Sequence, residues 1–203
     1  MKKTILISVL LSFVLTACHP ELFEFNTQIP GEYTIAGYNM SDEFEDIEFY
    51  ADNAMRMYPG AKACMMLSEI TDLSADMTVQ LLEGQGLKFF IRSNCNYYPD
   101  HPTITFEYRI DGYIIKEDDR IVAESTKPTA DYGKRVRIVI HNYAKNIMIT
   151  ADCDTLCRFD TYIPNTEYII AEALPGSSAD ISGISFIDTD DWEDSENYII
   201  QYE

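Results

Sequence analysis

The strongest constraint on the fold of this chain is an alternation of apolar and other residues with a period of two. In the stretch 103–109, TITFEYR, the side chains of Ile104, Phe106 and Tyr108 alternate with polar or charged ones. In the stretch 135–140, RVRIVI, apolar residues at 136, 138 and 140 alternate with Arg135, Arg137 and Val139. Successive side chains of a β-strand point to opposite faces of a sheet, so each stretch predicts a strand with one buried face.

Short stretches of this kind follow one another along most of the chain, and none carries a sustained helical period. The others are DMTVQLL, GLKFFIR, NIMITA, CRFDTYI, TEYIIAEA, ISGISFI and ENYIIQY. In GLKFFIR the alternation places Lys88 and Arg92 opposite the apolar face. Asp111-Gly112 lies between FEYRI and YIIKE and predicts a hairpin turn, because both residue types tolerate positive φ. Roughly ten or more short strands separated by turns predict an all-β sandwich.

The order of these stretches from about residue 49 to 187 resembles the concanavalin A-like lectin/glucanase superfamily. The resemblance rests on FYADNAMRMYPGAKACMMLSEITDLSADMTVQL, on EGQGLKFFIRSN, and on KRVRIVIHNYAKNIMITADCDTLCRFDTY followed later by ADISGISF. The family implies a single jelly-roll β-sandwich, over residues 33–203 here, and it includes laminin-G-like and sugar-binding domains. Its closing hairpin often turns at Asp-Gly, which Asp152-Cys153 replaces in this chain.

The first residues carry the features of a cleaved secretory signal. Lys2 and Lys3 precede an apolar run, residues 4–14, which is too short to span a bilayer as an ordinary helix. The LTAC that follows, ending at Cys18, resembles the lipobox of bacterial lipoproteins. That resemblance implies a signal peptide over residues 1–17 and a lipid-modified Cys18 at the new N-terminus. A soluble secreted protein with a chance cysteine is the alternative.

The residues around the lipid-modified cysteine bear on where such a protein resides. His19 stands where lipoproteins kept in the inner membrane often carry Asp, so the resemblance implies the outer membrane. Residues 18–32 show no clear period and end near Pro30 and Gly31, which predicts a lipidated tether ahead of the domain. Whether the domain faces the periplasm or the cell surface stays open.

The charge balance of the chain excludes one class of partner. The chain has 34 acidic and 15 basic residues and a formal net charge of −19, so nucleic acid repels it. Solubility is the simplest interpretation of the acidity, and a cationic partner or a calcium ion is the alternative. The acidic stretch 188–196 around Trp192 offers carboxylate oxygens but lacks the spacing of an EF-hand loop. We therefore expect no cofactor and no metal site, with calcium as the alternative.

The chain contains five cysteines, of which four remain once Cys18 is acylated. Disulfides are permitted outside the cytoplasm, and four cysteines allow three full pairings. Cys153 and Cys157 flank DTL, and if the strands on either side pair around it, the two cysteines face each other across the turn. The sequence thus predicts a Cys153–Cys157 disulfide, with Cys64 and Cys95 free or joined to each other.

Motifs for catalysis and for zinc binding are incomplete. Cys153, Cys157 and His141 would supply only part of a zinc site, because a second ligand pair at the usual spacing is missing. The stretch nearest to the paired carboxylates of retaining glucanases is DEFEDIEF, residues 42–49, whose order does not match that motif. The sequence contains no G-x-S-x-G, no H-E-x-x-H, no P-loop and no Rossmann glycines. It therefore predicts no catalytic residue.

One loop carries the chemistry expected of a sugar site. The loop is SNCNYYPDHP, residues 93–102, between two predicted strands. Aromatic faces can stack on the apolar face of a sugar, and amide or carboxylate groups can bond its hydroxyls. The candidate ligand-binding residues are Asn94, Asn96, Tyr97, Tyr98 and Asp100. The alternative is that the two tyrosines only pack over the core at one end of the sandwich.

The sequence as a whole predicts a non-catalytic module on a lipid anchor. It would be held in the outer membrane through Cys18 and would bind a glycan, such as a polysaccharide, or a surface protein. Two alternatives remain from other functional classes: a glycoside-active enzyme of the same superfamily, and a structural or assembly component of a cell-surface complex. A converging pair of carboxylates in a groove would distinguish the enzyme from the binding module.

Overall fold

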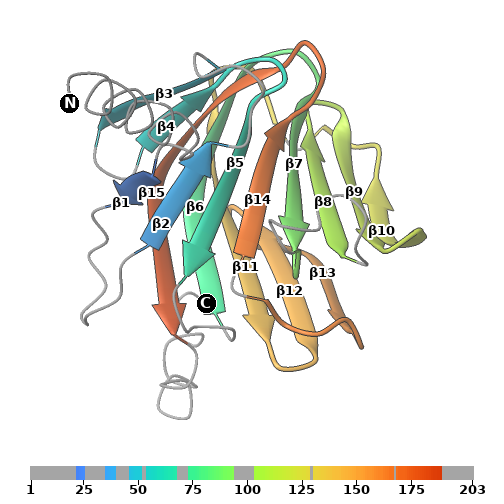
Figure 1. Ribbon diagram of the computed structural model, residues 1–203. Helices are drawn as coiled ribbons and strands as arrows, with labels where there is room; N and C mark the ends of the chain where they lie inside the picture. The colour runs from blue at the N-terminus through green and yellow to red at the C-terminus, as the bar shows by residue number, and fades with distance from the viewer. Residues whose placement is uncertain are drawn as a thin grey trace, which may run out of the picture.

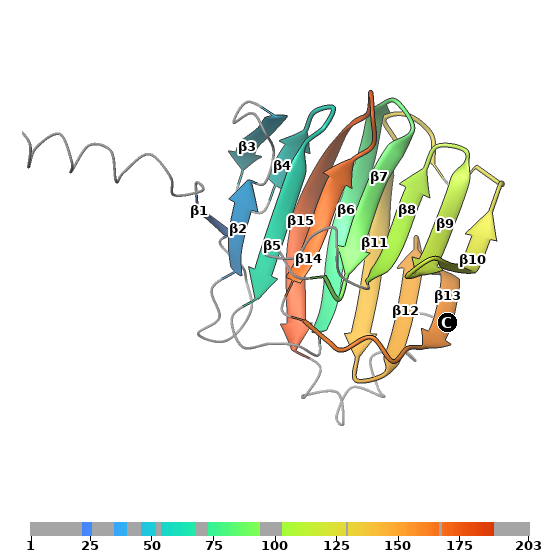
Figure 2. The same cartoon turned by 45° about the vertical axis from the view of Figure 1, so that its right-hand side comes forward.

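The computed structural model describes residues 22–25, 35–39, 46–51, 54–67, 73–93, 103–128, 130–166 and 168–188. Their backbone forms two antiparallel sheets that lie face to face, as the two views in Figures 1 and 2 show. None of these residues is assigned to an α-helix. The prediction of an all-β sandwich is confirmed.

The first sheet has eight strands, in the spatial order β1, β2, β5, β14, β7, β8, β9 and β10. Their bounds are β1 Leu22–Phe25, β2 Ile35–Asn39, β5 Lys62–Leu67, β14 Tyr168–Ala173, β7 Gly86–Ile91, β8 Ile104–Arg109, β9 Gly112–Glu117 and β10 Arg120–Ser125. Strand β14 lies between β5 and β7, which precede it by about half the chain, so long-range pairing builds the centre of this sheet.

The second sheet has seven strands, in the order β13, β12, β11, β6, β15, β4 and β3. Their bounds are β13 Asp154–Asp160, β12 Asn146–Ala151, β11 Arg135–Tyr143, β6 Leu73–Glu83, β15 Ser178–Asp188, β4 Ala54–Met57 and β3 Ile47–Ala51. The long strands β6 and β15 pair at its centre.

The core lies between the two sheets and consists of the residues that the alternation predicted. Along β8, Ile104, Phe106 and Tyr108 are fully buried and face inward. Phe106 stacks on Phe89 of β7, with ring centroids 5.8 Å apart. From the other sheet, Val136, Ile138 and Ile140 of β11 complete the packing. An aromatic pair of this kind contributes about 0.5–1.5 kcal/mol beyond its area of burial.

The first sheet begins earlier in the chain than the sequence predicted. Strand β1 pairs with β2 from Leu22 opposite Tyr38 to Phe25 opposite Ile35, inside the segment 18–32 that was predicted to be a tether. Strand pairing uses backbone N–H and C=O groups, which every residue except proline carries. A segment without a clear side-chain period can therefore still form an edge strand.

The turn between β12 and β13 lies at Asp152-Cys153, where the resemblance to the superfamily predicted it. Asp152 and Cys153 form a two-residue connection, because Ala151 pairs with Asp154. Both residues have positive φ, 47° and 73°. A two-residue hairpin turn of this handedness requires positive φ at both positions, which usually favours Asn, Asp or Gly.

The predicted hairpin at Asp111-Gly112 forms, but its turn is displaced by one residue. Arg109 pairs with Gly112, so the two turn residues are Ile110 and Asp111. Position 112 requires glycine for a steric reason. A Cβ added there would lie 1.9 Å from the carbonyl oxygen of Ser125, because β10 ends directly against the backbone of Gly112.

The predicted Cys153–Cys157 bridge is wrong. Both residues are free thiols, the first exposed and the second buried. The tight turn places Cys153 at its apex, whereas Cys157 pairs with Ile149 along the strand, so the two do not face each other. Cys64, on β5, is disulfide-bonded, and its partner lies outside the described residues.

Candidate functional site

The predicted sugar loop connects two neighbouring strands of the eight-stranded sheet. Ile91 at the end of β7 pairs with Ile104 at the start of β8, so both ends of the loop leave the sandwich side by side. Asn94, Asn96, Tyr97, Tyr98 and Asp100 themselves lie outside the described residues. The structure therefore locates the base of this loop, and the surroundings of that base can be examined.

Arg92 holds the base of the loop to the other sheet. Its side chain is buried and its φ is +58°, in the left-handed region. The guanidinium donates from Nε to Oδ1 of Asn142 at 2.8 Å and from Nη2 to the carbonyl oxygen of Ala144 at 2.7 Å. It also donates from Nη1 to the carbonyl oxygen of Ile163. One side chain thus joins the β11–β12 hairpin, the segment before β14 and the end of β7, at the base of the predicted loop.

The sequence had placed Arg92 on the solvent face of its strand, which the structure corrects. Strand β7 ends at Ile91, and the positive φ of the next residue breaks the alternation. Arginine is seldom fully buried unless it is paired, so its position next to a polar loop predicted exposure. No local pattern in the sequence signals that acceptors from residues 142, 144 and 163 converge there.

A bare aromatic ring lies at the same end of the sandwich. Tyr162 is 91% exposed and directly precedes Ile163, whose carbonyl oxygen accepts from Arg92. The Nζ of Lys145 lies 5.9 Å from the centroid of the Tyr162 ring. The backbone N–H of Thr161 donates to the carbonyl oxygen of Lys145 at 2.7 Å, which fixes the two connections to each other. The ring is thus presented to solvent on a rigid support.

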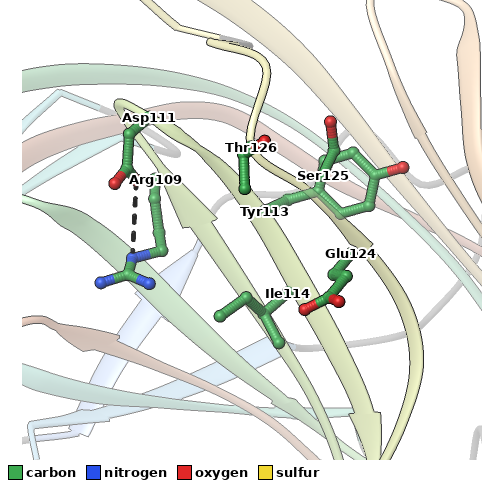
Figure 3. A pocket seen from close by; sticks show the side chains of 7 residues that line it. All are labelled: Arg109, Asp111, Tyr113, Ile114, Glu124, Ser125 and Thr126. Carbon is green, nitrogen blue, oxygen red and sulfur yellow. Dashed lines mark ion pairs between the residues drawn. The ribbon is translucent and has the colours of Figure 1, made fainter.

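A small hollow lies near one edge of the eight-stranded sheet, where β8, β9 and β10 meet (Figure 3). Its volume is about 80 Å³, and its lining residues are Arg109, Asp111, Tyr113, Ile114, Glu124, Ser125 and Thr126. Nε of Arg109 lies 3.8 Å from Oδ1 of Asp111, as the dashed line in Figure 3 marks. Pockets that bind small molecules usually measure about 300–1,000 Å³, so this hollow does not enclose a sugar ring.

The centre of the outer face of the eight-stranded sheet is not open to a ligand. Cys64, Ile170 and Phe90 lie on one register line across β5, β14 and β7 and are absent from the core cluster between the sheets. All three point away from that core, yet the first two are fully buried and Phe90 is 5% exposed. An extended ligand therefore has no access to this part of the face.

The next register line of the same face carries two carboxylates. Glu172 of β14 and Glu107 of β8 flank Lys88 of β7. The Nζ of Lys88 lies 3.5 Å from Oε1 of Glu107 and also lies over the ring of Phe90. Glycoside cleavage needs an acid and a base or nucleophile with the sugar between them. An ammonium group between these carboxylates instead stabilises Glu107 as an ion-paired residue.

The residues considered for zinc do not come together as a ligand set. Nδ1 of His141 lies 2.6 Å from Oγ of Ser74 on β6, and Cys153 is in a turn. Burial raises the pKa of the Cys157 thiol to about 11, which disfavours the thiolate that zinc requires. Among the residues that the structure describes, no group of three or more His, Cys, Asp or Glu side chains could hold a metal ion. Most of the acidic stretch 188–196 lies outside those residues.

Comparisons with known proteins identify the fold. No protein-family model matches the chain, and no curated protein is similar to it in sequence. The chain is similar to the carbohydrate-binding module CBM66 from Bacillus subtilis, at 13% identity and TM-score 0.52, with 80% of this chain and 98% of that chain covered. A Bacillus subtilis protein of unknown function with a galectin-like fold is 9% identical with TM-score 0.56, with 82% of this chain and 94% of that chain covered. Bacillus licheniformis β-glucanase is 11% identical with TM-score 0.51, covering 80% and 95%.

These likenesses and the two antiparallel sheets define a single jelly-roll β-sandwich of the concanavalin A-like type, as the sequence predicted. At such low identity they establish the fold alone, because one fold supports many unrelated activities. Across the described part of the chain, no helix is long and apolar enough to cross a membrane.

Proposed function

We propose that this protein is a non-catalytic glycan-binding module, held in the outer membrane by a lipid on Cys18. The fold supports glycan binding at a coarse level, because one similar structure is a carbohydrate-binding module and another is a β-glucanase. The lipobox-like LTAC supports the lipid anchor. Several acyl chains on one residue anchor a protein far more firmly than a single chain does.

The observation that carries the glycan proposal is the bare ring of Tyr162. A hydrophobic ring that is 91% exposed gains little from folding, since most of its apolar surface remains in water. It would gain by stacking on the apolar face of a sugar, and Lys145 could donate to a hydroxyl beside it. The hydrogen bonds of Arg92 hold the base of the predicted loop at this same end of the sandwich.

The binding role is favoured over hydrolysis because of the charges on the sheet face. Glu107 and Glu172 share a register line, but Lys88 lies between them. Its ion pair with Glu107 occupies the carboxylate that hydrolysis would need as an acid or base. The same ion pair is compatible with a module that only binds.

The test of the glycan proposal is a broad glycan array probed with the full chain in detergent. We expect binding, and we expect Tyr162→Ala to weaken it by roughly 1–3 kcal/mol, by analogy with aromatic stacking on other flat ligands. Tyr132→Ala is the matched control, because Tyr132 is 56% exposed and bonds to Gly84 at the opposite end of the sandwich. The melting temperature of Tyr162→Ala should stay close to that of the wild type. An array without any bound glycan would instead favour the assembly component.

The anchor is tested separately with Cys18→Ala. This substitution removes the thiol to which the lipid would be joined, so metabolic labelling with a radioactive fatty acid should be lost. The precursor should also remain uncleaved and migrate more slowly in a gel. Labelling that persists in the variant would show that the chain is not acylated at Cys18.

A further inference from the structure

The outer face of the seven-stranded sheet is open, in contrast to the centre of the other outer face. Tyr50 is 47% exposed and Tyr143 is 48% exposed. The side chain of Arg137 is 50% exposed, although it pairs with Asp76. A ligand that lay flat on the sandwich would therefore find an accessible surface on this side.

One register line of this face carries only polar side chains over five neighbouring strands. We call it the cross-strand strip, and it consists of Glu48 on β3, Arg56 on β4, Asp180 on β15, Gln80 on β6 and Arg135 on β11. Neighbouring strands lie about 4.8 Å apart, so the strip extends over roughly 19 Å. This length suits an extended chain molecule rather than a single small ring.

Hydrogen bonds hold the middle of the strip in a fixed geometry. Arg56 donates to both carboxylate oxygens of Asp180, from Nε at 2.7 Å and from Nη2 at 2.9 Å. At one end, the hydroxyl of Tyr58 donates to Oε2 of Glu48 at 3.0 Å. Bidentate pairs of arginine and carboxylate are geometrically specific, so the middle of the strip is preorganised.

The other end of the strip retains hydrogen-bonding capacity. Arg135 is exposed, and its Nε donates to Oε1 of Gln80 at 3.4 Å, which is a long contact. Within the described ranges, Arg135 forms no ion pair. A guanidinium has five N–H donors in a planar fork, so most of its donors remain available to a ligand.

A β-bulge brings an aromatic ring to the strip. Phe49 pairs with Met55 and Ala51 pairs with Ala54, so Tyr50 is an extra residue on β3. Bulges of this kind re-aim a side chain, and the guanidinium carbon of Arg56 lies 5.8 Å from the centroid of the Tyr50 ring. Partial burial and the nearby Asp180 raise the pKa of Tyr50 above its ordinary value, which agrees with a hydroxyl that lies beside the strip.

The charges of the strip fit a neutral ligand. Its two carboxylates and two guanidinium groups balance, although the chain as a whole carries a formal charge of −19. A strongly charged ligand of either sign would face groups of like charge along the strip. Sugar hydroxyls both donate and accept, so they match a line on which donors and acceptors alternate.

We propose that the cross-strand strip binds a neutral, linear oligosaccharide that lies across the strands, with one sugar ring stacked on Tyr50 and hydroxyls bonded to Arg135 and Gln80. This inference rests on the proposed glycan-binding function and adds a second contact surface to the one around Tyr162. The sugar chain runs perpendicular to β3, β4, β15, β6 and β11.

The test measures the affinity of neutral oligosaccharides for the full chain by isothermal titration calorimetry. Tyr50→Ala and Arg135→Gln should each weaken binding about tenfold, a typical effect for one stacking or hydrogen-bonding group. Tyr143→Ala is the matched control, because Tyr143 has nearly the same exposure and lies at the far end of β11. Melting temperatures of all three variants should remain close to that of the wild type.

The possible outcomes separate the two proposals. If Tyr143→Ala or Tyr162→Ala weakens binding while Tyr50→Ala and Arg135→Gln do not, the strip is only a solvated sheet face and the glycan-binding function stands. If the chain binds charged glycans and no neutral ones, the ligand class assigned to the strip is wrong. If no oligosaccharide binds the wild type, both proposals are overturned.

Discussion

Nε of Arg92 lies 2.8 Å from Oδ1 of Asn142, and this buried hydrogen bond joins the end of one sheet to a strand of the other. Two backbone carbonyl oxygens, from Ala144 and Ile163, accept from the same guanidinium. One buried side chain therefore links three segments at the end of the sandwich that carries Tyr162.

Arg92→Ala should be strongly destabilising. The substitution removes a buried guanidinium that donates to Oδ1 of Asn142 and to the carbonyl oxygens of Ala144 and Ile163. We expect the free energy of unfolding to fall by about 3 kcal/mol or more. Chemical denaturation measures this free energy. Arg120→Ala is the control, because the Arg120 side chain is 67% exposed and its ion pair with Glu117 should contribute less than about 1 kcal/mol to stability. Equal effects of the two substitutions would contradict the role given to Arg92.

Gly112→Ala should destabilise the β8–β10 region through a steric clash. The new Cβ would lie 1.9 Å from the carbonyl oxygen of Ser125, so β10 has to move away. Gly176→Ala is the matched control: φ there is +70°, but nothing lies within 4 Å of the added atom. Gly176→Ala should lower the free energy of unfolding by about 1–2 kcal/mol through backbone strain alone, and Gly112→Ala should lower it clearly more. Thermal unfolding of the two variants compares them directly.

The thiols should differ in reactivity in the native protein. Cys153 is exposed and should react with a maleimide at once, whereas Cys157 is buried and its raised pKa disfavours the reactive thiolate. Labelling of Cys157 should therefore require unfolding. In peptide maps of non-reduced protein, we expect Cys64 to be linked to Cys95. A Cys64–Cys153 link would contradict the free thiols and the pairing of β12 with β13.

Stability should fall as the pH drops through the range where histidine titrates. Burial lowers the pKa of His141 below its ordinary value, more than the nearby Asp76 raises it, and Arg137 lowers it further. The unfolded chain then binds a proton at a higher pH than the folded chain does, so acidification favours unfolding. His141→Gln should make stability depend less on pH between about pH 7.5 and pH 5.5. Ordinary carboxyl groups titrate below this range, so they contribute little to the change there. An unchanged slope in denaturation midpoints would exclude His141 as its source.

The local pattern of the sequence determined the strands and much of the fold class. The alternation in TITFEYR and RVRIVI identified β8 and β11 and their inward residues, because the period of two follows from the geometry of a single strand. The turn at Asp152-Cys153 was predicted from the resemblance to the superfamily, whose closing hairpin often turns at Asp-Gly, and both residues have positive φ in the structure.

Only the tertiary structure decided which strands are neighbours and what their side chains meet. The displaced turn at Ile110, the free thiols at 153 and 157, and the burial of Arg92 all depend on register or on groups far away in the chain. The cross-strand strip is the clearest case: its five members lie on five strands between residues 48 and 180, and pairing alone aligns them. Strand pairing is non-local and uses backbone groups that all residues share, so no short stretch of sequence encodes it.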